Sequence, residues 1–94
     1  MQKFEIGDTI RIIDIPEEDK DLSRPDDPEM RTHELFRFCL GKQFRVRAVD
    51  KESGTVELTV SDNKEVRRIF GDYHTIWIES KFVVLIRRNG RNKG

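Results

Sequence analysis

The most constraining feature of this 94-residue chain is a pair of alternating segments, QFRVRAVD at 43–50 and TVELTV at 55–60. Alternation of apolar and polar residues with a period of two is typical of half-buried strands. KESG between them predicts a hairpin with a three-residue loop, followed by Gly54 in the left-handed conformation. In that register Arg47 lies opposite Glu57. One face would carry Phe44, Val46, Ala48, Val56, Leu58 and Val60, and the other Arg45, Arg47 and Val49.

Three further segments have strand character. TIRIID at 9–14 follows Gly7-Asp8 and places Ile10 and Ile12 on one face, together with Asp8. YHTIWIES and KFVVLIRR come near the end of the chain and meet at a tight corner, residues 79–81, while the polar segment between 61 and 72 reads as a connection. Five short strands of this kind predict a mainly β fold, a small and strongly bent antiparallel barrel.

One short helix is predicted within this barrel, at about residues 28–40 after the first strand. Either Asp27 caps it, with Pro28 as the first helical residue, or the helix starts only at Thr32, whose hydroxyl could cap it. In both cases Gly41 provides a left-handed stop. The preceding segment, 17–29, is rich in Asp, Glu and Pro and is predicted to be a long surface loop with solvated charges. This loop has no Gly, which argues against an EF-hand calcium site.

Composition limits the classes of protein to which this chain can belong. Charged residues make up 38% of the chain, but 18 basic residues balance 18 acidic ones. A single cysteine cannot form an internal disulfide, and no apolar run approaches the roughly 18 residues that span a bilayer. We therefore expect a cytoplasmic protein without membrane contact. Its length predicts one domain, residues 1–88, and the composition of residues 89–94 predicts a disordered basic tail.

The residues that suggest chemistry are Cys39 and His33. Six positions along a helix correspond to a rotation of about 600°, which leaves the two side chains roughly 120° apart. One cysteine and two histidines also fall short of a local four-ligand zinc pattern. The sequence therefore favours a buried, inert Cys39, a His74 hydrogen-bonded at the barrel rim, no cofactor, no metal and no catalytic activity of its own.

A binding surface is the remaining possibility. Alternation turns Tyr73 and Trp77 away from the face that holds Ile76 and Ile78. The candidate surface comprises Arg11, Arg45, Arg47, Tyr73 and Trp77. Aromatic and arginine side chains dominate protein interfaces and also hold single-stranded nucleic acid. The alternative is that the predicted helix or the 61–72 connection covers Trp77. The neutral net charge favours a protein partner over nucleic acid.

The segments FEIGDTIRIIDIP, THELFRFCLGKQFRVRAVD and TIWIESKFVVL together resemble the SH3-like small barrel of the nitrile hydratase beta subunit. The matching positions are Gly7, Asp8, Arg11, Pro16, Thr32, Phe38 and Gly41. In that family the catalytic metal belongs to the other subunit, whose cysteine-rich motif has no counterpart in this chain. The resemblance therefore implies an accessory or docking module, with a 3₁₀ turn leading into its final strand.

Overall fold

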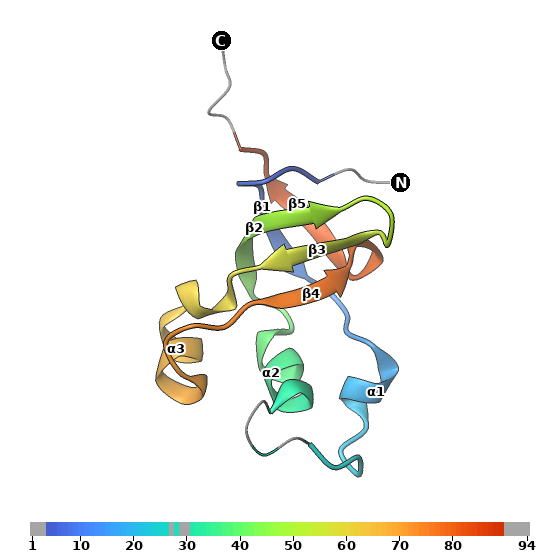
Figure 1. Ribbon diagram of the computed structural model, residues 1–94, viewed down its shortest axis with the longest axis vertical. Helices are drawn as coiled ribbons and strands as arrows, with labels where there is room; N and C mark the ends of the chain where they lie inside the picture. The colour runs from blue at the N-terminus through green and yellow to red at the C-terminus, as the bar shows by residue number, and fades with distance from the viewer. Residues whose placement is uncertain (1–3, 27, 29–30, 90–94) are drawn as a thin grey trace.

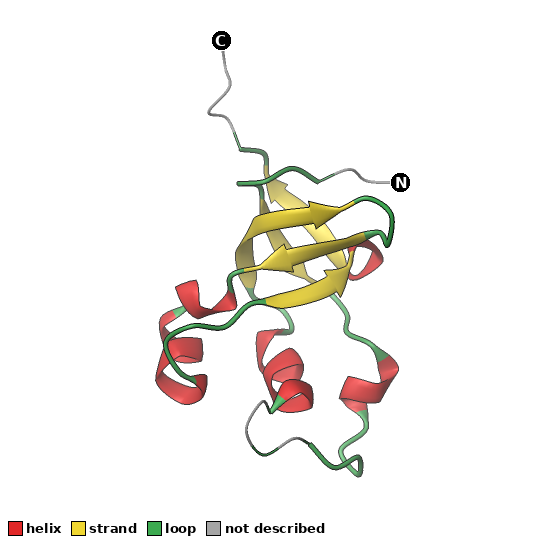
Figure 2. Ribbon diagram, in the orientation of Figure 1, coloured by secondary structure: helices red, strands yellow, loops and turns green. Residues whose placement is uncertain are grey.

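The computed structural model describes residues 4–26, 28 and 31–89. Its centre is one five-stranded sheet in the order β4-β3-β2-β1-β5, in which all neighbouring strands are antiparallel (Figures 1 and 2). The strands are β1 Thr9–Ile12, β2 Gln43–Asp50, β3 Thr55–Leu58, β4 Ile76–Glu79 and β5 Val83–Arg87. The predicted mainly β, five-stranded antiparallel architecture is therefore confirmed.

Strand β2 belongs to both halves of this sheet. Residues 43–45 pair with β1, whereas the pairing with β3 begins at Val46. At this transition the Val46 N–H donates to Asp8 O, and the Gly7 N–H donates to Val46 O, both at 2.8 Å. Figure 1 shows β1 and β5 crossing behind the layer of β2, β3 and β4. The described strands include no pairing between β4 and β5, so the sheet is bent but is not closed by hydrogen bonds.

The β2–β3 hairpin differs from the predicted register. Asp50 pairs with Thr55, which makes a four-residue turn, and Gly54 takes the left-handed conformation with a φ of 71°. Because of the extra turn residue Glu57 pairs with Ala48, and a register shift between Val46 and Ala48 then brings Val46 opposite Leu58. The predicted pairing of Arg47 with Glu57 is therefore wrong by one residue. The same bulge turns Val49, expected on the outer face, toward the core.

The helix predicted at about 28–40 starts at Thr32, the later of the two predicted starts, and the prediction of a single helix is wrong. The described chain contains the α-helices α1 Glu17–Lys20, α2 Thr32–Cys39 and α3 Lys64–Phe70, and the 3₁₀ turns η1 Val60–Asp62 and η2 Ser80–Phe82. Helix α2 begins only at Thr32 because Arg31, with a φ of 50°, has a left-handed backbone. Gly41 ends it with a φ of 86°, as predicted, and η2 is the expected 3₁₀ turn before the last strand.

Neither predicted cap forms in the described residues. Thr32 is the first residue of α2 and makes no capping bond. The cap comes instead from Asp26, whose two carboxylate oxygens accept the N–H groups of His33 and Glu34 at 3.1 and 3.0 Å. The alternative cap, Asp27, lies outside the described residues. A side chain from the preceding loop thus satisfies the free N–H groups of the first helical turn.

Helix α3 occupies the segment that the sequence predicted to be a polar connection. The Asn63 carboxamide oxygen accepts the Val66 N–H at 3.1 Å, and Gly71, with a φ of 115°, follows the last helical residue. Val66 is the one fully buried residue of this helix. Val66, Ile69 and Phe70 have helical spacing, but a helix of seven residues spans only about two turns, which is too short for a clear periodic pattern.

Buried side chains from the sheet and the helices form one hydrophobic cluster. Helix α2 contributes Leu35, Phe36 and Cys39, and α3 contributes Val66. The three α-helices lie at one end of the sheet, and the first and last described segments of the chain lie at the opposite end (Figure 1). The outer sheet face is thus left to the strands. No helix within the described residues is long and apolar enough to span a membrane.

Candidate functional site

All five residues of the predicted binding surface are exposed. Trp77 lies in β4 with its side chain 47% exposed, and Tyr73 precedes β4 and is 70% exposed. Trp77 is not part of the hydrophobic cluster to which α2 and α3 contribute. The alternative in which the helix or the 61–72 segment covers Trp77 is therefore wrong. The structure instead divides the five residues between the two halves of the sheet.

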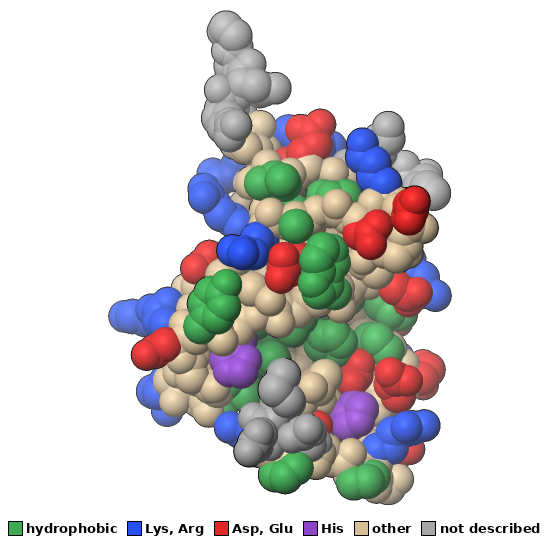
Figure 3. Space-filling model, viewed as in Figure 1, with side chains coloured by type: hydrophobic (Ala, Val, Ile, Leu, Met, Phe, Trp, Pro, Cys, Tyr) green, Lys and Arg blue, Asp and Glu red, His purple; other side chains and the backbone are tan. Residues whose placement is uncertain are grey.

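The first half, which we call the aromatic half, comprises Arg47, Glu57, Tyr73 and Trp77. Glu57 is the cross-strand partner of Trp77, and its Oε1 lies 3.4 Å from Arg47 Nε. A cation, an anion and an indole thus follow one another across β2, β3 and β4. Figure 3 shows basic, acidic and large hydrophobic side chains adjacent to one another across the middle of this face. The Glu57 side chain is only 16% exposed, so its carboxylate is largely shielded from solvent beside the indole.

The position of Tyr73 depends on its neighbour His74. The His74 backbone N–H donates to Ser61 Oγ at 3.1 Å, and the Ser61 N–H donates to His74 O at 3.3 Å. The His74 ring nitrogen Nε2 lies 2.6 Å from Phe70 O. The predicted structural role of His74 is confirmed. These contacts fix the segment that carries Tyr73 against η1 and α3.

The second half, which we call the basic half, contains Arg11 and Arg45. Thr9 in β1 pairs with Arg45 on one side and with Arg87 on the other. Arg88 and Asn89 follow Arg87, and all of these residues except Arg11 line a pocket with Gly7. Arg11 lies two residues along β1, opposite Gln43 and Val84. Arg87 and Arg88 were predicted to end the last strand but were not predicted to belong to this surface, because only the strand order brings them beside Thr9 and Arg45.

Asp8 is a buried carboxylate that holds residues of the basic half in place through hydrogen bonds. Its side chain is fully buried and accepts three hydrogen bonds at 2.8 Å, from the Glu5 N–H, the Asn89 N–H and Arg88 Nη1. Asn89, predicted to belong to the tail, is thus held to β1. The other residues of the predicted tail, 90–94, lie outside the described residues. A buried carboxylate needs such partners, so Asp8 fixes Arg88 beside β1.

A second carboxylate, Asp19 in α1, contradicts the prediction that the acidic segment carries only solvated charge. The Asp19 side chain is 3% exposed, and its Oδ1 lies 2.6 Å from His33 Nδ1 in α2. Burial raises the pKa of Asp19, and the hydrogen bond with His33 opposes that rise. Arg37 Nη1 donates to Asp19 O at 2.9 Å. This cluster joins α1 to α2 and gives His33 a structural partner other than Cys39.

Cys39 is fully buried in the core, as predicted. Burial raises the pKa of its thiol to about 12. The thiol is therefore protonated at neutral pH and is a poor nucleophile. Across the part of the chain that the structure describes, no group of three or more His, Cys, Asp and Glu side chains is placed to hold a metal ion.

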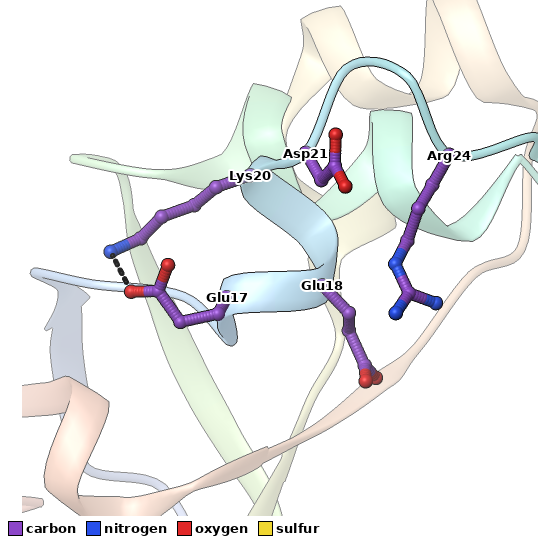
Figure 4. Close-up of a pocket in the computed structure, with 5 residues that line it drawn as sticks. All are labelled: Glu17, Glu18, Lys20, Asp21 and Arg24. Atoms are coloured by element: carbon purple, nitrogen blue, oxygen red, sulfur yellow. Dashed lines mark hydrogen bonds and ion pairs between the residues drawn. The ribbon is translucent and has the colours of Figure 1, made fainter.

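A surface hollow of about 590 Å³ lies around α1. Its lining consists of five charged residues of one chain segment: Glu17, Glu18, Lys20, Asp21 and Arg24. Lys20 Nζ contacts Glu17 Oε2 at 3.1 Å, while the Lys20 and Asp21 side chains point away from each other (Figure 4). The charges do not converge on a common point, so this hollow offers no defined site.

No protein-family model matches the chain, and neither a curated protein nor a solved structure matches it significantly.

Proposed function

We propose that this chain is a non-catalytic SH3-like barrel that serves as a protein-interaction or accessory module in the cytoplasm. Support for the barrel comes from the strand order, which places the last strand beside the first, and from β2, which passes between the two halves of the sheet. The 3₁₀ turn before β5 matches the expected closing corner.

The observation that carries this proposal is the exposed aromatic half. Trp and Tyr bring large, stiff contact areas to an interface, and together with Arg they dominate interface hot spots. Here Trp77 lies on strand β4, which is paired along its length with β3, and Arg47 is held by Glu57 beside it. A partner can therefore cover an apolar ring and form polar contacts around it without a rearrangement of the sheet. We expect that partner to be a protein.

A site-specific photo-crosslink tests this function. A photoreactive benzoylphenylalanine replaces Tyr73, and the protein is irradiated in cells of its native host. We expect a discrete protein adduct that disappears in the Trp77→Thr variant. Leu22→Thr is the matched control, because Leu22 is also an exposed apolar residue but lies after α1, away from the sheet. No adduct, or an adduct that survives Trp77→Thr unchanged, would contradict the proposed interface.

Nucleic-acid binding is the second candidate function, and the clustering of Arg45, Arg87 and Arg88 at one pocket favours it. Its test is titration with a mixed pool of single-stranded RNA at low and moderate salt while Trp77 fluorescence is followed. Contacts to phosphates make affinity fall steeply as salt rises. The interaction-module proposal predicts no response at low salt. Tight, strongly salt-dependent binding would replace that proposal.

A further inference from the structure

We propose that the pocket of the basic half binds one phosphate-class oxyanion of a small ligand. The pocket has a volume of about 320 Å³ and lies where β1, β2 and β5 meet the end of the described chain. That size is at the lower end of small-molecule sites, which span roughly 300–1,000 Å³. It is lined by Gly7, Thr9, Arg45, Arg87, Arg88 and Asn89.

The sheet register builds the pocket. Thr9 is paired with Arg45 and with Arg87, so the short threonine side chain lies between two long arginines. Neighbouring strands are about 4.8 Å apart, which places the two arginine backbones roughly 10 Å from each other. This span lets both guanidinium groups reach an anion above Thr9 from opposite sides.

Two of the three arginines that line the pocket have no carboxylate partner among the described residues. Arg45 and Arg87 form no ion pair with any carboxylate that the structure describes, whereas Arg88 contacts Asp8 at 2.8 Å and Glu5 at 4.0 Å. Arg45 in β2 and Arg87 in β5 lie on either side of β1, and their like charges repel each other across that strand. A bound anion would remove this repulsion.

The donor set fits phosphate. Guanidinium groups donate paired N–H bonds in a planar fork that matches two phosphate oxygens at a time. Two such forks on opposite sides of Thr9, whose hydroxyl is a further donor, suit an anion with oxygens in several directions. A planar carboxylate can be bound fully by one fork. We therefore infer a tetrahedral oxyanion.

The pocket also favours a single phosphate over a nucleic-acid strand. Its lining contains no aromatic residue on which a base could stack, although stacking supplies much of the affinity for single strands. The exposed Trp77 and Tyr73 belong to the other half of the sheet. This inference is therefore independent of the proposed protein interface, and either one can fail alone.

The test is an NMR titration of backbone amides and arginine side-chain N–H groups with inorganic phosphate at constant ionic strength, with sodium chloride as the reference. We expect saturable shifts around Thr9, Arg45 and Arg87. Binding should weaken at least tenfold in Arg45→Gln and in Arg87→Gln. Arg47→Gln removes the same charge from the other half of the sheet and should change binding less than twofold. The amide spectrum of each variant reports whether it is folded.

Three outcomes would overturn the inference. One is a linear, unsaturable response that chloride reproduces, and another is equal weakening by Arg45→Gln and Arg47→Gln, which would indicate only general charge attraction. The third comes from a parallel arm with a short single-stranded RNA. RNA that displaces phosphate from the pocket and binds far more tightly, with a steeper salt dependence, would make nucleic acid the ligand instead.

Discussion

The aromatic and basic halves of the sheet share β2 and one hydrophobic core but differ in how their surface charge is balanced. On the aromatic half Arg47 is paired with Glu57, and Trp77 lies beside that pair. On the basic half the partner of Arg88 is buried beneath it, while Arg45 and Arg87 have no carboxylate partner in the described chain. The chain as a whole is neutral. Local pairing, and not net charge, therefore decides what each surface can bind.

The largest expected effect tests whether the two halves are one folding unit. Ile10 in β1 and Leu58 in β3 are both fully buried, one on each side of β2. Replacing either by Ala should lower the free energy of unfolding by about 3 kcal/mol, because each change leaves a cavity in the shared core. Urea unfolding should remain one transition by circular dichroism and by Trp77 fluorescence. An Ile10→Ala protein whose Trp77 transition is unshifted would divide the sheet into two independent units.

An intermediate effect is expected from Asp8→Asn, which keeps the size of the side chain but removes its charge. Hydrogen bonds to charged groups are worth about 1.5–3 kcal/mol, so we expect a loss of about 2 kcal/mol in the free energy of unfolding. Amide hydrogen exchange should also become faster at Asn89, whose N–H donates to Asp8. Asp72→Asn is the control, because Asp72 is exposed. Similar losses in the two variants would mean that Asp8 does not anchor the basic half.

The smallest expected effect concerns the ion pair of the aromatic half. A double-mutant cycle of Arg47→Ala and Glu57→Ala should give a coupling energy of about 0.5 kcal/mol, because Arg47 is half exposed and solvent screens the pair. The same cycle with Arg45→Ala should give no coupling to Glu57. Urea denaturation of the single and double variants measures both values. Equal couplings would show that charge is not partitioned between the halves.

Strand identity could be predicted from this sequence because alternation reports which face of a strand is buried. The details of register could not. A parity argument assumes a regular ladder, and the bulge near Arg47 changes the parity within β2 itself. Helices α1 and α3 were missed because each is short and has one fully buried residue, Asp19 or Val66. The burial of Asp19 also depends on His33, fourteen positions away.

The residues of the candidate surface could be predicted from the sequence, but their division between the two halves of the sheet could not. Outward alternation identified Trp77 and Arg45, yet only the strand order places them on different halves. Asp8 offered an unused signal, because it shares the inward parity of Ile10 and Ile12 and must find partners there. Sequence alone could not select Arg88, eighty positions away, from eighteen basic residues. The pairing of Asp8 with Arg88 depends on the position of β5 beside β1.

The contacts between the first and last described segments also make this chain suited to circular permutation. The Asn89 carboxamide donates to Ile6 O at 3.1 Å, and the exposed turn 51–54 lies between β2 and β3. A circular permutant could join the segment after Asn89 to the segment before Phe4 by a short glycine linker and open at this turn. Exposed turns tolerate such cuts well. The order of strands in space would be preserved while β3 became the first strand to be synthesised.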